Sequence, residues 1–239
     1  MKQKHHWIFG IIAVLGIILL IGCVEEGVAI GEVIDKWNEI VGIHNEVGNS
    51  LTGFGAALTG EPPSAGEEND FNSLKIGMRT FASYYRNQVD LAKTYLEQAD
   101  SKLDEESNSI NEFFGLAARL SNPEAKKYGE SAANNLREYN IKAKTCISGT
   151  STVIESMATE IGNMANSFET KLEIYQPKVD AGTFTENEYT NLLNEYTDMG
   201  NKFATKMTDL MKQFPSDCEE RNAFFEKAED AINQLGSIQ

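Results

Sequence analysis

Three polar side chains occupy positions where helical spacing predicts apolar residues. They are Glu106, Tyr139 and Arg221, which carry a carboxylate, a phenol and a guanidinium group. Such a set could hold a small polar ligand, or it could fix the register of packed helices as a buried ion pair, because a buried charge requires a partner. We favour the buried ion pair and keep a small-ligand site as the alternative.

The sequence lacks the motifs of catalytic or metal-binding helical proteins. It contains no Glu-x-x-His pair for a di-iron centre, no Cys-x-x-Cys pair for zinc or redox chemistry, and no glycine-rich nucleotide turn. His44 has no second histidine beyond the N-terminal segment. Residues 182–188 look like half of an EF-hand loop, but Pro177, Val179 and Ala181 occupy the first ligand positions. We therefore predict no catalytic, cofactor-binding or metal-binding residues, and no enzyme.

Amphipathic helices must position these side chains. Apolar residues recur at alternating intervals of three and four along most of the chain, which predicts helices packed against one another. The expected helices run over residues 30–51, 70–120, 125–175 and 185–214, with a last piece over 218–235. Thr185 opens a capping box with Glu188, and Pro215 must break the last helix.

These elements predict a single all-α domain over residues 30–239. Glycines and prolines interrupt the pattern over residues 53–69, so we predict a loop there. Matching helix lengths with short turns favour antiparallel neighbours. We expect an elongated antiparallel bundle of three long helices with a shorter N-terminal fourth helix and coiled-coil-like packing. In shape alone, this bundle resembles spectrin-like repeats and chemoreceptor sensor bundles, although the motifs of those families are missing.

The N-terminus has the layout of an export signal. Lys2 and Lys4 precede an apolar run of about 14 residues, Ile8 to Ile21, and the small residue Gly22 follows. The sequence Leu20-Ile21-Gly22-Cys23 resembles the lipobox of prokaryotic membrane lipoproteins.

This resemblance implies that residues 1–22 are a signal peptide, that Cys23 carries the lipid anchor, and that residues 23–29 form a tether. The alternative is a retained membrane helix over residues 7–24, which is just long enough to span a bilayer. Both interpretations place the rest of the chain at the cell membrane, facing outside the cytoplasm.

The two remaining cysteines are candidates for a disulfide bond. Outside the cytosol an even pair of cysteines favours a bridge. If the chain reverses at Gly182, Cys146 and Cys218 lie 36 residues before and after the turn, at the same height of an antiparallel hairpin. A reversal at Asn122 likewise places Glu106 opposite position 138, beside Tyr139, and the reversal at Gly182 places Arg221 near position 143. We therefore expect Glu106, Tyr139 and Arg221 near one layer beside the cysteines.

The charge restricts the partners of the exported chain. Without residues 1–22 it carries 19 basic and 36 acidic residues, a formal charge of −17 at pH 7. Nucleic-acid binding needs clustered basic residues and is therefore excluded. We expect an interaction, spacer or assembly module that contacts a protein partner or itself. The alternative is a sensor or solute-binding bundle with an unknown small-molecule ligand.

Overall fold

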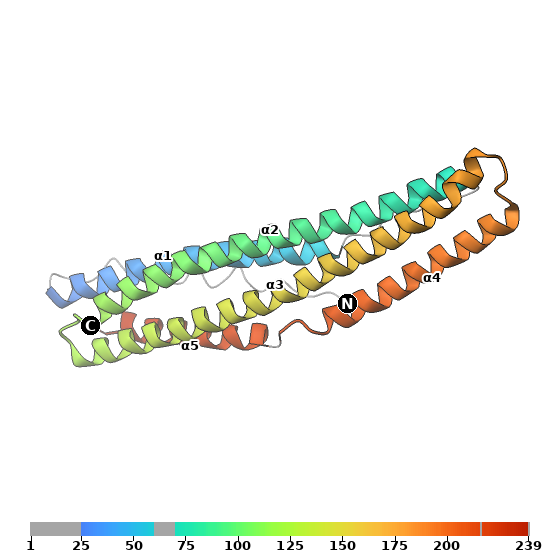
Figure 1. The fold of residues 1–239 in the computed structure, drawn as a ribbon. Helices are drawn as coiled ribbons and strands as arrows, with labels where there is room; N and C mark the ends of the chain where they lie inside the picture. Colours follow the sequence, from blue (N-terminus) through green and yellow to red (C-terminus); the bar gives the residue numbers. More distant parts are fainter. Residues whose placement is uncertain (1–24, 60–69, 216, 239) are drawn as a thin grey trace. The chain divides into compact units, whose positions relative to one another are not determined.

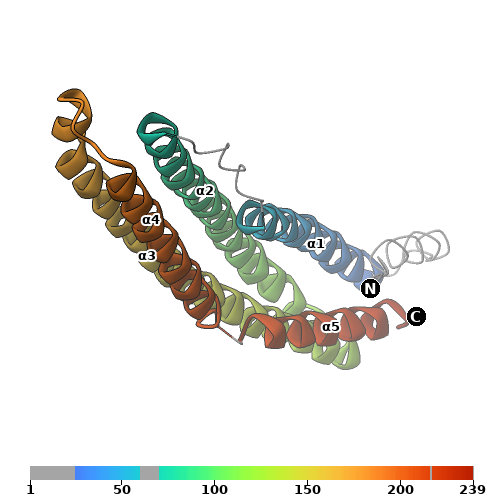
Figure 2. The ribbon, with the colours of Figure 1, turned by 90° about the vertical axis from the view of Figure 1, so that its right-hand side faces the viewer.

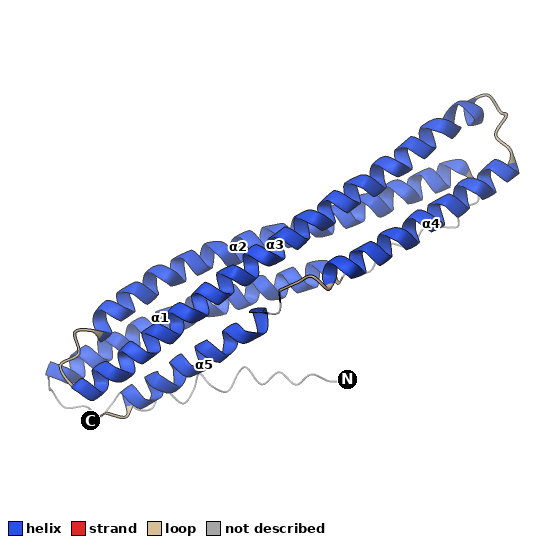
Figure 3. Ribbon diagram, turned by 60° about the horizontal axis from the view of Figure 1, so that its bottom comes forward, coloured by secondary structure: helices blue, strands red, loops and turns tan. Residues whose placement is uncertain are grey.

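The computed structural model describes residues 25–59, 70–215 and 217–238. Its helices are α1 (Glu25–Leu58), α2 (Phe71–Ala117), α3 (Pro123–Asp180), α4 (Glu186–Met211) and α5 (Asp217–Gly236) (Figure 1). In this part of the chain the structure contains no strand (Figure 3), so the prediction of an all-α fold is confirmed. The predicted signal peptide 1–22 and the predicted lipid anchor Cys23 lie outside the described residues.

Packing divides the described chain into two compact units, whereas the sequence predicts one domain. Unit 1 contains residues 25–41, 107–139 and 222–238, and unit 2 contains residues 42–59, 70–106, 140–215 and 217–221. Helical periodicity continues through α2 and α3, and for this reason it cannot reveal the division. The buried apolar side chains form two separate clusters, one in each unit.

Unit 1 is a bundle of four helical segments around an apolar core. The core contains Ile30, Val33, Trp37 and Ile40 from α1, Ile110 and Phe113 from α2, Leu136 from α3, and Ile232 and Leu235 from α5. The ring of Phe225 lies between those of Trp37 and Tyr139, with centroids 5.4 Å from each. Asn122 caps α3 by accepting hydrogen bonds from the backbone N–H groups of Glu124 and Ala125.

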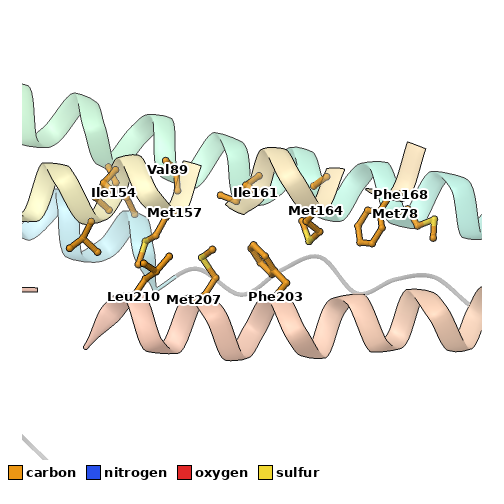
Figure 4. Close-up of a cluster of buried hydrophobic side chains, with 14 of the residues drawn as sticks. Met78, Val89, Ile154, Met157, Ile161, Met164, Phe168, Phe203, Met207 and Leu210 are labelled. Atoms are coloured by element: carbon orange, nitrogen blue, oxygen red, sulfur yellow. The ribbon is translucent and has the colours of Figure 1, made fainter. Parts of the chain in front are cut away.

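Unit 2 is built from the second half of α1 with α2, α3 and α4. Figure 4 shows Phe203, Met207 and Leu210 of α4 pointing toward the buried side chains of α2 and α3. Thr185 and Glu188 form the predicted capping box at the start of α4. Burial of one stripe of each helix therefore holds this unit together.

Polar contacts between neighbouring helices of unit 2 confirm their antiparallel pairing. Along α2, residues 75, 79 and 104 pair with residues 176, 169 and 144 of α3. Lys171 and Glu160 of α3 pair with Glu195 and Lys206 of α4, so α3 and α4 also run in opposite directions, side by side (Figure 2). The chain reverses after α3 at Gly182, which has the left-handed φ of 67° expected of such a turn.

The predicted loop over residues 53–69 is wrong for its first part, because α1 continues to Leu58. Ala57 is buried in the core of unit 2, and the ring of Phe54 lies 6.0 Å from that of Phe214. Burial of these apolar side chains outweighs the low helix propensity of the glycines around them. The rest of the predicted loop, residues 60–69, lies outside the described part of the chain.

Two prolines lie near helix ends. Helix α3 continues through Pro177 and ends at Asp180, five residues beyond the end that the sequence predicts. Pro215 lies between α4 and α5, as predicted. Its ring packs on Gly149, where an added Cβ atom would lie 2.5 Å from the proline side chain. Glycine at position 149 therefore permits this close approach.

Candidate functional site

Cys146 of α3 and Cys218 of α5 form a disulfide bond in unit 2, with their Cα atoms 5.3 Å apart. The bond joins residues 72 positions apart. This bond is the pairing that the sequence predicts. It forms because the two cysteines face inward at the same height of the antiparallel hairpin that reverses at Gly182. The bond attaches the helix that follows Pro215 to α3.

Glu106 of α2 is completely buried beside this disulfide-bonded region. Its Oε2 atom accepts a hydrogen bond of 3.0 Å from Nδ2 of Asn140, and the same amide donates to the carbonyl oxygen of Leu103 at 2.9 Å. Among the described residues, Oε1 of Glu106 accepts no hydrogen bond. The Nδ1 atom of His44, on α1, lies 3.8 Å from Oε1, beyond hydrogen-bond distance.

Burial shifts the proton affinities of this acid and this base in opposite directions. It raises the pKa of Glu106 from 4.5 to about 7, against the hydrogen bond from Asn140 and the positive charges of Arg221 and Lys144. Burial and the charge of Arg221 lower the pKa of His44 from 6.5 to about 4. His44 is therefore neutral at pH 7 and cannot neutralise the Glu106 carboxylate.

Arg221 of α5 supplies the positive charge of this cluster. Its Nη1 atom lies 4.0 Å from Sγ of Cys146, and its buried Nε atom has no hydrogen-bond partner within the described residues. The guanidinium lowers the pKa of both Glu106 and His44 through its charge. We call Glu106, His44, Asn140 and Arg221 the polar cluster of unit 2.

The structure places two of the three residues predicted for a polar layer in this cluster, Glu106 and Arg221. Tyr139 belongs to unit 1, where its ring packs against Phe225. Sequence reasoning missed Asn140 and treated His44 as a lone residue. Asn140 directly follows the inward-facing Tyr139, so its side chain lies beside the apolar stripe of α3. This position next to the stripe is the sequence signal that could have identified Asn140 as part of the cluster.

The cluster contains one buried carboxyl group, that of Glu106, whose pKa is raised to about 7. In residues 25–59, 70–215 and 217–238, no three His, Cys, Asp or Glu side chains gather in a way that could hold a metal ion. A shallow open depression lies along α3 between Pro123 and Asn135, and the described residues that line it all belong to that helix.

None of the helices in the described part of the chain carries an apolar stretch long enough to cross a membrane. Comparisons of the chain with models of protein families, with curated proteins and with solved structures find no match.

Proposed function

We propose that this chain acts outside the cytoplasm, attached to a membrane by lipid on Cys23, as a helical interaction, spacer or assembly module. The observation that carries this proposal is the disulfide bond between Cys146 and Cys218. Disulfides persist in oxidising compartments and are rare in the cytosol. With these two cysteines paired, Cys23 is the one cysteine left for the lipid that a lipobox directs.

The surface and the fold support a binding role without catalysis. The exported chain is strongly acidic, which favours solubility and a basic or apolar protein partner over nucleic acid. Large apolar side chains are also exposed on three helices of unit 2, Ile76 on α2, Ile141 and Ile174 on α3, and Met211 on α4. Such residues supply contact area for a partner or a second copy.

The attachment is tested by fractionating cells and measuring the mass of the N-terminal peptide. We expect the protein in the membrane fraction with an acylated N-terminal Cys23, and Cys23→Ser released into the soluble fraction. Cys146→Ser is the matched control, because it removes another cysteine and keeps Cys23. An unmodified N-terminus that begins at Met1 would contradict the proposal.

The disulfide gives a second, independent test. Unfolding the unreduced protein and alkylating its thiols should label neither Cys146 nor Cys218. In the chain-entropy model, a bond closing a loop of this length contributes about 4 kcal/mol, so reduction should lower the unfolding free energy by about that amount. Two reactive thiols in the protein isolated from cells would argue against an oxidising compartment.

The interaction role is tested with the membrane-anchored protein. Crosslinking in intact cells, followed by purification in detergent, should recover a protein partner, and sedimentation should show whether that partner is a second copy of the chain. A strict monomer that crosslinks to nothing would contradict the role.

A second candidate function is a sensor or solute-binding bundle, favoured by the buried and unpartnered Oε1 atom of Glu106 beside Arg221. A solute that binds the folded protein raises its melting temperature. Amino acids and small amines are suitable probes, because they carry groups that pair with a carboxylate. A rise in melting temperature that Glu106→Gln abolishes would favour the sensor over the interaction module.

A further inference from the structure

The second half of α1, residues 42–58, differs from the other helices of unit 2 in how weakly its own sequence favours a helix. We call this segment the strap. It contains four glycines, Gly42, Gly48, Gly53 and Gly55. A Cβ atom added at Gly42, Gly48 or Gly55 would meet no described residue within 4 Å, so packing against the described chain does not require glycine at these three positions. Because glycine loses more backbone entropy than alanine, each of them weakens the helix.

Hydroxyl groups weaken the same segment further. Ser50 and Thr52 donate side-chain hydrogen bonds to the backbone carbonyls of Glu46 and Gly48. Such bonds compete with the hydrogen bonds of the helix and slightly destabilise it. The disulfide joins α3 to α5 and does not restrain α1. The strap is therefore held to unit 2 by its side-chain packing.

The packing that holds the strap is apolar along most of its length. Val47 and Ala57 are buried, and Leu51 and Phe54 are half-buried against the core of unit 2. Figure 1 shows this end of α1 lying along α2, where the backbone at Gly53 lies against the ring of Tyr95. An added Cβ atom at Gly53 would lie 2.5 Å from that ring, so a larger residue here would force the ring to shift. Displacing the strap would expose an apolar face of α2.

At its first turns the strap covers the buried carboxylate of Glu106, through His44. Each other element packed around that carboxylate brings polar or basic groups: Asn140 and Lys144 from α3, and Arg221 from α5. When Glu106 loses its proton, a buried anion with one unpartnered oxygen faces a neutral imidazole. Water would relieve this penalty, and displacing the strap admits water.

We propose that residues 42–58 open and close on the rest of unit 2 as a strap, while α2, α3 and α4 remain packed. Burial of its apolar side chains closes the strap. Two effects favour the open strap. They are the backbone entropy that Gly42, Gly48 and Gly55 regain and the hydration of the Glu106 carboxylate. Opening uncovers the apolar side chains of unit 2 that the closed strap covers. This inference stands apart from the proposed membrane attachment.

Hydrogen exchange of the full-length protein in detergent micelles tests the strap, with mass spectrometry separating residues 42–58 from residues 71–106 of α2. We expect the strap amides to exchange at least 100-fold faster than the protected amides of α2. The triple variant Gly42→Ala, Gly48→Ala, Gly55→Ala should slow strap exchange about 100-fold, given roughly fivefold per substitution, and leave α2 unchanged.

Two matched substitutions serve as controls for the triple variant. Gly162→Ala makes the same change on α3, where an added Cβ atom would also meet none of the described residues within 4 Å, and it should leave strap exchange unchanged. Gly53→Ala makes the same change within the strap, where the new methyl group would collide with the ring of Tyr95. This substitution should therefore accelerate strap exchange. Equal exchange rates in strap and α2, or equal slowing of both in the triple variant, would overturn the proposal.

The Glu106→Gln variant tests the opening of the strap independently of its glycines. Glutamine keeps an acceptor for Asn140 and removes the buried negative charge. Strap exchange in this variant should be slower than in the wild type above pH 7 and equal to it near pH 4. Strap exchange that is unaffected by this substitution at every pH would show that hydration of Glu106 has no part in opening.

Discussion

The two halves of α1 are equally helical, but apolar packing and glycine content differ between them. Residues 25–41 bury Ile30, Val33, Trp37 and Ile40 in the core of unit 1. Residues 42–58 belong to unit 2, contain four glycines, and bury Ile43, Val47 and Ala57, with Leu51 and Phe54 half-buried. Equal helicity therefore conceals unequal stability, since in short segments most helical stability comes from packing of an apolar face. Three predictions test this comparison.

The largest effect is expected in the first half of α1. Trp37→Ala removes a buried indole that packs on Phe225 and leaves a cavity in unit 1. Such a substitution costs about 3–5 kcal/mol of unfolding free energy. Denaturant unfolding measures the loss, and hydrogen exchange should show it in residues 30–41. If residues 42–58 lost their protection instead, the contrast between the two halves would be wrong.

The second prediction concerns the protonation of Glu106 in unit 2. The folded state raises the pKa of Glu106 from 4.5 to about 7, so the stability from this group is complete below pH 4.5 and is lost as the pH rises through 7. Relative to the wild type, Glu106→Gln should therefore gain nothing near pH 4 and about 3 kcal/mol above pH 7.

His44 has the opposite dependence and makes this prediction sharper. Its pKa falls from 6.5 to about 4, so its contribution is present above pH 6.5 and is lost as the pH falls toward 4. In the wild type the two slopes cancel between pH 4.5 and 6.5. Glu106→Gln leaves the slope of His44 alone, so this variant should lose stability below pH 6.5. Denaturant unfolding at a series of pH values measures the unfolding free energy of the wild type and of the variant. If the stability of Glu106→Gln depended on pH as little as that of the wild type, the opposite pKa shifts of Glu106 and His44 would be wrong.

The smallest effect is expected at the surface of the strap. Glu46 of the strap and Lys102 of α2 form an ion pair of 2.7 Å whose side chains are both exposed to solvent. Exposed pairs contribute little, because water and salt screen them. Glu46→Ala should leave strap exchange and denaturant unfolding unchanged within error. A large change at low salt that disappears at high salt would show that charge holds the strap closed, rather than its apolar packing.

Much of the fold could be read from spacing and from single residues. The alternation of three and four predicts the helices, Pro215 predicts the gap between α4 and α5, and the reversal at Gly182 sets the register that joins Cys146 to Cys218. Each of these depends on local geometry or on a simple antiparallel pairing. Antiparallel pairing about reversals at Asn122 and Gly182 also predicted that Glu106 and Arg221 lie in one polar layer, and in this sense the core of the site was predictable.

Other features depend on contacts between residues far apart in the chain. Glycine content predicts a loop from residue 53, whereas burial of apolar side chains such as Phe54 and Ala57 in unit 2 makes its first part helical. The division into two units is absent from the periodicity, because α2 and α3 continue through it. The protonation of Glu106 likewise depends on what surrounds it.

The sequence alone therefore determined the helices, their order and the cysteine pair, since periodicity, proline and glycine act over one or two turns. Tertiary structure decided where α1 ends, which core Tyr139 joins, and how strongly Glu106 holds its proton. These outcomes depend on burial, which is a property of the packed chain rather than of any segment.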